Sequence, residues 1–131
     1  MKIPEKVLNL LNDPSASKVL TTISAEGIPH SIVVGSIMAA NDETICAAEV
    51  LMKKTAENLK TNKNIAVLTV KGKESYLVNA MVAERQTEGD LFNKVSDQMK
   101  KAGMPMRALW IFNPTAVYDQ SAGPTAGTQI V

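Results

Sequence analysis

Apolar and polar residues alternate along most of the chain with a period of about two residues, which is typical of β-strands that bury one face. The alternation is clearest in the neighbouring segments 64–70 and 74–85, which the turn residues Lys71-Gly72-Lys73 separate. The Asn113-Pro114 pair interrupts a later segment and predicts a bulge or bend there. The predicted strands are Lys18–Ser24, Ile28–Ala40, Glu43–Glu49, Asn64–Val70, Glu74–Arg85 and Arg107–Gln120.

Three other segments have the spacing of amphipathic helices. They are Ile3–Leu11, Met52–Asn62 and Gly89–Ala102. The third of them places Leu91, Phe92, Val95 and Met99 on one face and is followed by the helix-ending residues Gly103 and Pro105.

The order of these elements predicts a mainly β fold of the α+β class. Ala25-Glu26-Gly27 supplies a turn between the first two strands, which indicates a β-hairpin, and no βαβ unit is evident. We therefore expect a six-stranded antiparallel split β-barrel with peripheral helices, built as one domain over residues 1–131. The tail after Gln120 is rich in Gly, Ala and Thr, so we expect it to be irregular or to pack over a partner subunit.

Composition excludes several classes of function. The net charge is +1, which gives no electrostatic basis for binding nucleic acid or an anionic membrane. One cysteine and one histidine exclude an internal disulfide and a multi-cysteine metal site, and we predict no metal centre. No signal peptide or apolar run of membrane-spanning length is present, which favours a cytoplasmic protein.

The most informative motif is the octet from Met52 to Leu59, MKKTAENL, which places two lysines where a helix is predicted to begin. A helix N-terminus favours anions, so Lys53, Lys54 and Thr55 together would suit a phosphate group. The alternative is that Thr55 caps the helix and both lysines are solvated.

These residues resemble those of the FMN-binding split-barrel family, which includes small FMN-binding proteins and is related to pyridoxamine 5′-phosphate oxidase. The resemblance covers residues 7–118 and lies in the N-terminal helix, the hairpin LTTISAEGIPH and the segment KTAENL. The Lys-Thr-x-x-Asn pattern after a short strand is its more specific part.

The resemblance implies an FMN groove at a homodimer interface, with Lys54 and Thr55 on the phosphate and Lys53 as a second cation. The remaining cofactor-binding residues that it implies are Val33, Val34, Gly35 and Ser36, which would run alongside the flavin, and Ala47, Ala48, Glu49 and Met52, which would line the same groove. Relatives use a C-terminal segment with Arg and His to hold pyridoxamine phosphate, whereas this chain has neither, nor Lys, after Arg107. The activity of that particular oxidase is therefore not expected.

Other single residues have a simpler and a functional interpretation. His30 suits a solvated hairpin position or a proton donor near a flavin, and Trp110 suits the core, a dimer interface or a flavin contact. Cys46 is expected to be a small buried apolar group rather than a reactive thiol. Met104 and Met106 lie where relatives reach toward the flavin of the partner subunit.

Three functions remain open at this stage. The first is a dimeric FMN flavoprotein in electron transfer or acting as a small oxidoreductase, whose catalytic residues, substrate and redox partner are unknown. The second is an F420-binding reductase, in which Lys53, Lys54, Lys60 and Lys63 would face the acidic tail of the deazaflavin. The third is a non-catalytic ligand-binding barrel.

Overall fold

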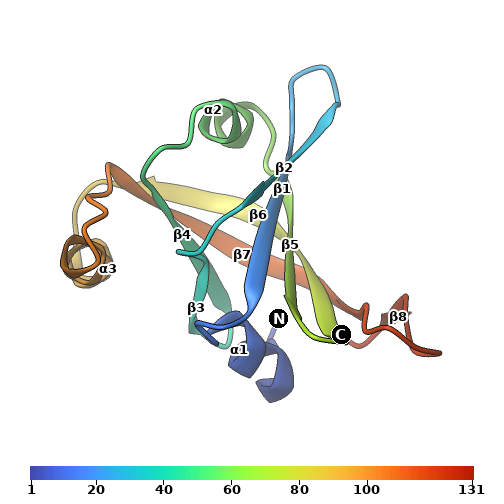
Figure 1. The fold of residues 1–131 in the computed structure, drawn as a ribbon. Coiled ribbons are helices and arrows are strands. Elements are labelled where there is room, and N and C mark those ends of the chain that lie inside the picture. Colours follow the sequence, from blue (N-terminus) through green and yellow to red (C-terminus); the bar gives the residue numbers. More distant parts are fainter.

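A single antiparallel sheet organises the chain, and the computed structural model describes all of residues 1–131 (Figure 1). The strands are β1 (Ser17–Ile23), β2 (Pro29–Val33), β3 (Met38–Asn41), β4 (Thr44–Glu49), β5 (Asn64–Lys71), β6 (Glu74–Gln86), β7 (Ala108–Asp119) and β8 (Thr128–Gln129). Their order in the sheet is β2-β1-β5-β6-β7-β4-β3, and β8 pairs with β7. The mainly β, α+β class is thus confirmed. The sheet has eight strands rather than six, and it is not closed because its end strands β2 and β3 do not pair.

The segment predicted as one long strand, Ile28–Ala40, contains a turn that divides it into β2 and β3. Ser36 lies at the break, where its hydroxyl rather than its backbone bonds to the backbone of β4. The hydroxyl accepts a hydrogen bond from the Ala48 N–H at 3.1 Å and donates one to the Ala48 carbonyl at 3.4 Å. The chain thereby leaves β2 and re-enters the other edge of the sheet as β3.

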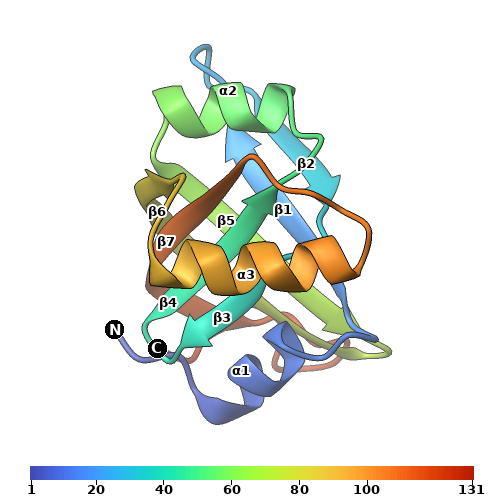
Figure 2. The ribbon, with the colours of Figure 1, turned by 90° about the vertical axis from the view of Figure 1, so that its left-hand side faces the viewer.

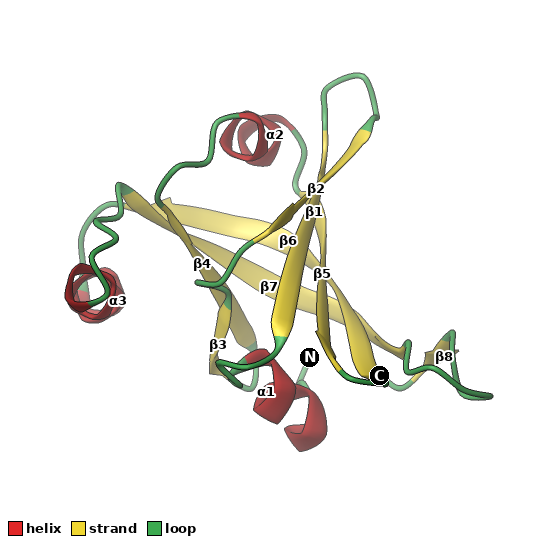
Figure 3. Cartoon of the chain, viewed as in Figure 1, coloured by secondary structure: helices red, strands yellow, loops and turns green.

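Three helices lie around the sheet on different sides, as Figures 1 and 2 show: α1 (Glu5–Leu11), α2 (Lys54–Thr61) and α3 (Asp90–Lys101). Polar contacts tie two of them to strands. Asn58 of α2 donates a hydrogen bond from Nδ2 to Thr22 Oγ1 of β1 at 3.0 Å. Asn12, just after α1, accepts a hydrogen bond from the Ala39 N–H at 2.9 Å. Helix α2 is therefore held by its middle to β1, on the β1–β2 hairpin side of the sheet (Figure 3).

Both faces of β4 are buried, which explains its uninterrupted apolar run. Ile45 and Ala47 belong to the main core, whereas Cys46 and Ala48 lie in a second cluster beneath α3 with Val95. The predicted inward face of α3 is thus confirmed. Strand β7 passes through both clusters, since Trp110 and Phe112 face the main core and Leu109 and Ile111 face α3.

The strand irregularity predicted at Asn113-Pro114 is present. The β6–β7 register shifts where Asn79 pairs with Ala116 and Ala80 pairs with Pro114, so Thr115 is the additional residue. A proline at this point donates no ladder hydrogen bond, which a bulge tolerates.

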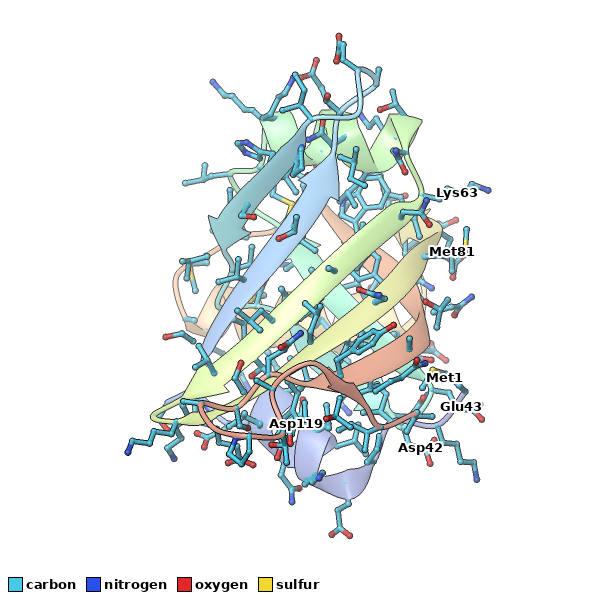
Figure 4. All side chains as sticks on the ribbon, turned by 90° about the vertical axis from the view of Figure 1, so that its right-hand side faces the viewer. Met1, Asp42, Glu43, Lys63, Met81 and Asp119 are labelled. Atoms are coloured by element: carbon cyan, nitrogen blue, oxygen red, sulfur yellow. The ribbon has the colours of Figure 1, made fainter.

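The C-terminal tail turns back onto its own chain. Residues Thr128 and Gln129 pair with Asp119 and Tyr118 of β7, and the Ile130 N–H donates to the Val117 carbonyl at 2.8 Å. Figure 4 shows this tail crossing the lower end of the β1–β5–β6 face near Asp119. Residues 121–127 have no helix or strand, as expected for this Gly-, Ala- and Thr-rich segment, and Thr128 and Gln129 after them form β8.

Candidate functional site

A groove of about 400 Å³ lies between the β2–β3 turn, the end of β4 with the loop after it, and the C-terminal end of α3. Nine of its eleven lining residues are hydrophobic. This volume and character are within the range of about 300–1,000 Å³ that is usual for small-molecule sites.

Most of the predicted flavin-contacting residues line this groove. The structure brings together Val33, Val34, Gly35, Ser36, Ala48 and Met52. Gly35 has ordinary backbone geometry, and a Cβ built there would meet no atom within 4 Å. The space beside Gly35 is thus open to a ligand, and no packing of the protein itself requires a glycine at this position.

Two residues expected in the same groove do not line it. Ala47 is fully buried in the main core, because strand alternation turns it away from its neighbour Ala48. Glu49 is 4% exposed and lies in a network of charged side chains. The expected groove needs Ala47, Ala48 and Glu49 on one side of β4. The pleat of the strand instead places Ala48 on one side and Ala47 and Glu49 on the other.

Glu49 is the centre of that network, which joins β4, β6 and β7. Arg85 donates hydrogen bonds from Nε to Oε1 at 3.2 Å and from Nη2 to Oε2 at 3.0 Å. Trp110 donates from Nε1 to Oε1 at 2.9 Å, and Nε of Arg107 lies 3.7 Å from Oε2. Burial alone would raise the pKa of Glu49, but the hydrogen bonds from Arg85 and Trp110 and both guanidinium charges lower this pKa below its usual value.

The residues at the start of α2 divide between different surroundings. Lys53 lines a second cavity of about 630 Å³, together with Arg107. Lys54 is exposed and contributes to lowering the pKa of Glu26 in the β1–β2 turn, after the larger effects of a backbone hydrogen bond and of Ser24. Thr55 is buried, and no side chain caps the helix. The backbone N–H groups of the first turn therefore have no side-chain acceptor.

Trp110 and Cys46 take their simpler interpretations, whereas the role of His30 stays a prediction. Trp110 is a core residue and uses its indole N–H on Glu49. Cys46 is fully buried, and burial raises the pKa of its thiol to about 11, so a thiolate is scarce at neutral pH. His30 lies half-buried on β2.

Sequence reasoning missed the two arginines of the charged network. The sequence pattern marks Arg85 only as the end of a predicted strand, and Arg107 only as the start of another strand and the last basic residue of the chain. Both contact Glu49 across strands that are distant in sequence, and no local pattern marks such a contact. Met104 lies at the wall of both cavities, and its expected reach toward the flavin of a partner subunit stays a prediction.

A family model described as pyridoxamine 5′-phosphate oxidase matches residues 3–121, which include every element that forms the groove. The chain belongs to this family. An uncharacterised protein of Methanocaldococcus jannaschii is a curated relative. It is 24% identical over 135 residues, which span 99% of this chain and 89% of that protein.

Solved structures share the family fold. HupZ of Group A Streptococcus superimposes with a TM-score of 0.82 and 21% identity, covering 95% of this chain and 99% of that chain. An FMN-binding protein of Syntrophomonas wolfei has a TM-score of 0.82 and 20% identity, covering 92% and 87%. The fold also occurs in an F420 reductase and in the haem storage protein HutZ of Vibrio cholerae, with TM-scores of 0.68 and 0.66. At these identities the likeness shows the fold alone.

No helix of this family member combines the length and the apolar character that crossing a membrane requires.

Proposed function

We propose that this protein binds FMN in the apolar groove and acts as a dimeric flavoprotein, in electron transfer or as a small oxidoreductase. The observation that carries the proposal is an apolar groove of about 400 Å³ whose wall includes Met52, just before the basic start of α2. Such a site matches a ligand with a flat apolar ring at one end and a dianion at the other. When bound, FMN would supply the redox chemistry, and the protein would supply orientation and electrostatics.

The ring end of the groove fits a flat aromatic group. Val33 and Leu51 lie at its rim, and the open space beside Gly35 permits close approach of a ring to the backbone. In the turn 34–37 the Val34 N–H donates to the Lys18 carbonyl at 2.9 Å and the Ile37 N–H donates to the Val34 carbonyl at 3.5 Å. The backbone N–H groups of Gly35 and Ser36 make no such bond, so they can serve the polar edge of the ring.

The phosphate end is assigned to Lys54 and Thr55. A phosphate there would accept hydrogen bonds from the uncapped N–H groups of α2 and would be favoured by the helix dipole. Glu57 in the first turn is an anion that the same helix dipole favours. The exposed ammonium group of Lys54 adds a second attraction for the phosphate.

Titration of the purified protein with FMN tests this proposal. We expect saturable quenching of flavin fluorescence, with FMN bound more tightly than riboflavin because only FMN carries the phosphate. Binding of neither flavin at micromolar concentration would contradict the proposal.

Other proteins of this fold are named for F420 or haem. Titrations with these two cofactors show whether this protein prefers either of them to FMN. F420 is the second candidate, because the basic cavity lined by Lys53 and Arg107 adjoins the groove and suits an acidic tail. Tighter binding of F420 than of FMN would favour the reductase, and a haem absorption band with no flavin binding would favour haem. Binding of none of the three would favour a non-catalytic barrel.

We also propose that two copies meet over the groove. Val33 is 77% exposed, Leu51 is 89% exposed and Met104 is 46% exposed, and all three line the same groove. An exposed apolar surface of this kind marks an interface, and a second copy would cover both the surface and one side of the flavin.

The homodimer can be tested with a charged residue in this surface. Replacing Leu51 with aspartate is expected to convert the dimer to a monomer, because an ionised carboxylate is costly to bury in an apolar interface. Light scattering measures the mass. The matched control is Met81→Asp, on the face shown in Figure 4, where a residue of 42% exposure should tolerate the charge. A monomeric wild-type protein at micromolar concentration would refute the dimer.

A further inference from the structure

The cavity of about 630 Å³ beside the groove has a distinct chemical character. Its wall comes from two loop segments, residues 50–53 after β4 and 103–107 before β7. The charged residues among its lining are Lys53 and Arg107, both cations. Val50, Leu51 and Met104 belong to the walls of this cavity and of the apolar groove, so the two spaces are neighbours.

Arg107 is held in place at this cavity while most of its donors stay available. Its backbone N–H donates to the Glu49 carbonyl at 2.8 Å, and Nη2 donates to the Met52 carbonyl at 3.4 Å. Its Nε lies 3.7 Å from the Glu49 carboxylate, and the side chain is 62% exposed. The guanidinium is thus oriented by the Met52 carbonyl and the buried Glu49 carboxylate, while the backbone of Arg107 is fixed separately by its bond to the Glu49 carbonyl.

The charge balance around Glu49 leaves this cavity positive. The carboxylate of Glu49 already accepts two hydrogen bonds from Arg85 and one from Trp110. One carboxylate between two guanidinium groups leaves an excess positive charge, and Lys53 adds another at the cavity wall. A carboxylate or phosphate ligand would complete the pairing.

We propose that this cavity is a second ligand site, which binds the carboxylate or phosphate of a small organic anion whose body reaches the neighbouring groove. The inference rests on the proposed function and names the class of the second reactant, an anionic molecule placed beside the flavin. Lys53 and Lys54 face different surroundings, so a nucleotide phosphate at Lys54 and Thr55 leaves the pair Lys53 and Arg107 for another anion.

The test uses inorganic phosphate as the probe and the side-chain N–H signal of Arg107 as the readout in nuclear magnetic resonance. Phosphate is titrated into the wild-type protein, with and without saturating FMN. We expect a saturable shift of the Arg107 signal in both cases. Phosphate affinity, measured by calorimetry with FMN at saturation so that the Lys54 and Thr55 site is filled, should fall at least about tenfold in Arg107→Gln and be partly restored in Arg107→Lys.

The matched control is Lys63→Gln, which removes one exposed positive charge at the α2–β5 loop and should leave phosphate affinity unchanged. FMN affinity should be the same in Arg107→Gln and wild type, and thermal melting verifies that the variant is folded.

The possible results are distinguishable. Absence of a saturable shift overturns the second site, and so does loss of phosphate binding on addition of FMN, because that competition assigns the cavity to the phosphate of FMN itself. A protein that binds phosphate at Arg107 but binds no FMN retains the anion site and loses the proposed flavin function.

Discussion

Replacing Lys54 and Thr55 together with alanine is expected to abolish retention of FMN while the sheet remains folded. The variant removes an ammonium group and a hydroxyl from the start of α2, where no side chain caps the helix. Each lost charge-assisted hydrogen bond costs about 1.5–3 kcal/mol, which is about 10- to 150-fold in affinity. Fluorescence titration with FMN measures the change, and circular dichroism verifies the fold.

The chain offers a matched control at the other end of the same helix. Lys60 and Thr61 are the same pair of residue types in the last turn of α2, and both are exposed. The double variant Lys60→Ala with Thr61→Ala should retain wild-type affinity for FMN. Riboflavin affinity should be nearly equal in both double variants and wild type, because riboflavin has no phosphate. Unchanged FMN affinity in Lys54→Ala with Thr55→Ala would refute the assignment of these two residues.

Replacing Glu49 with alanine is expected to produce the largest loss of stability among the polar residues around the site. The buried carboxylate accepts hydrogen bonds from Arg85 and Trp110, so its removal leaves these donors without an acceptor and deprives Arg107 of its counter-charge. Breaking a buried ion pair costs about 3–5 kcal/mol, and partial exposure of both arginines reduces this to about 2–4 kcal/mol. Urea denaturation measures the free energy of unfolding.

The lowered pKa of Glu49 predicts that the free energy of unfolding falls at acidic pH. Glu49 stabilises the fold fully above the pKa of an unfolded glutamate, about 4.3, and this stabilisation is lost as the pH falls through the lower pKa of the folded state. Glu49→Gln should therefore lose less stability than wild type on acidification. Glu43→Gln, which removes an exposed carboxylate of the β3–β4 turn, is the control and should follow wild type. Equal acid sensitivity in all three proteins would contradict this role of Glu49.

The strands and helices were largely predictable because their signals are local. The alternation in β5 and β6, the turn at Gly27 and the apolar face of α3 each lie within one continuous segment. Positive φ at Gly27, a conformation that glycine adopts readily, explains why the turn was recognisable from its residue type.

The division of β2 from β3 was not predictable, because it depends on a partner elsewhere in the chain. Residues 28–40 are apolar enough to continue as one strand. The chain turns where the Ile37 N–H donates to the Val34 carbonyl and Ser36 bonds to Ala48 of another strand. For a similar reason β8 was missed, since Thr128 and Gln129 form a strand only by pairing with β7.

The candidate site shows the same limit at the level of side chains. Adjacent lysines suggested one shared anion, but consecutive residues at a helix start point about 100° apart, and Lys53 lines a cavity with Arg107 instead of with Lys54. The arrangement of Glu49, Arg85 and Trp110 depends on the register of three strands, in which Arg85 pairs with Trp110. Single-sequence patterns do not contain that register.

We propose above all that the groove holds FMN between two copies of the chain. Native mass spectrometry of the protein purified from cells without added cofactor tests it most directly, because one spectrum reports the assembly and the mass of its ligand. We expect a dimer that carries one FMN per protomer. A monomer without ligand, or a dimer that carries a different small molecule, would contradict it.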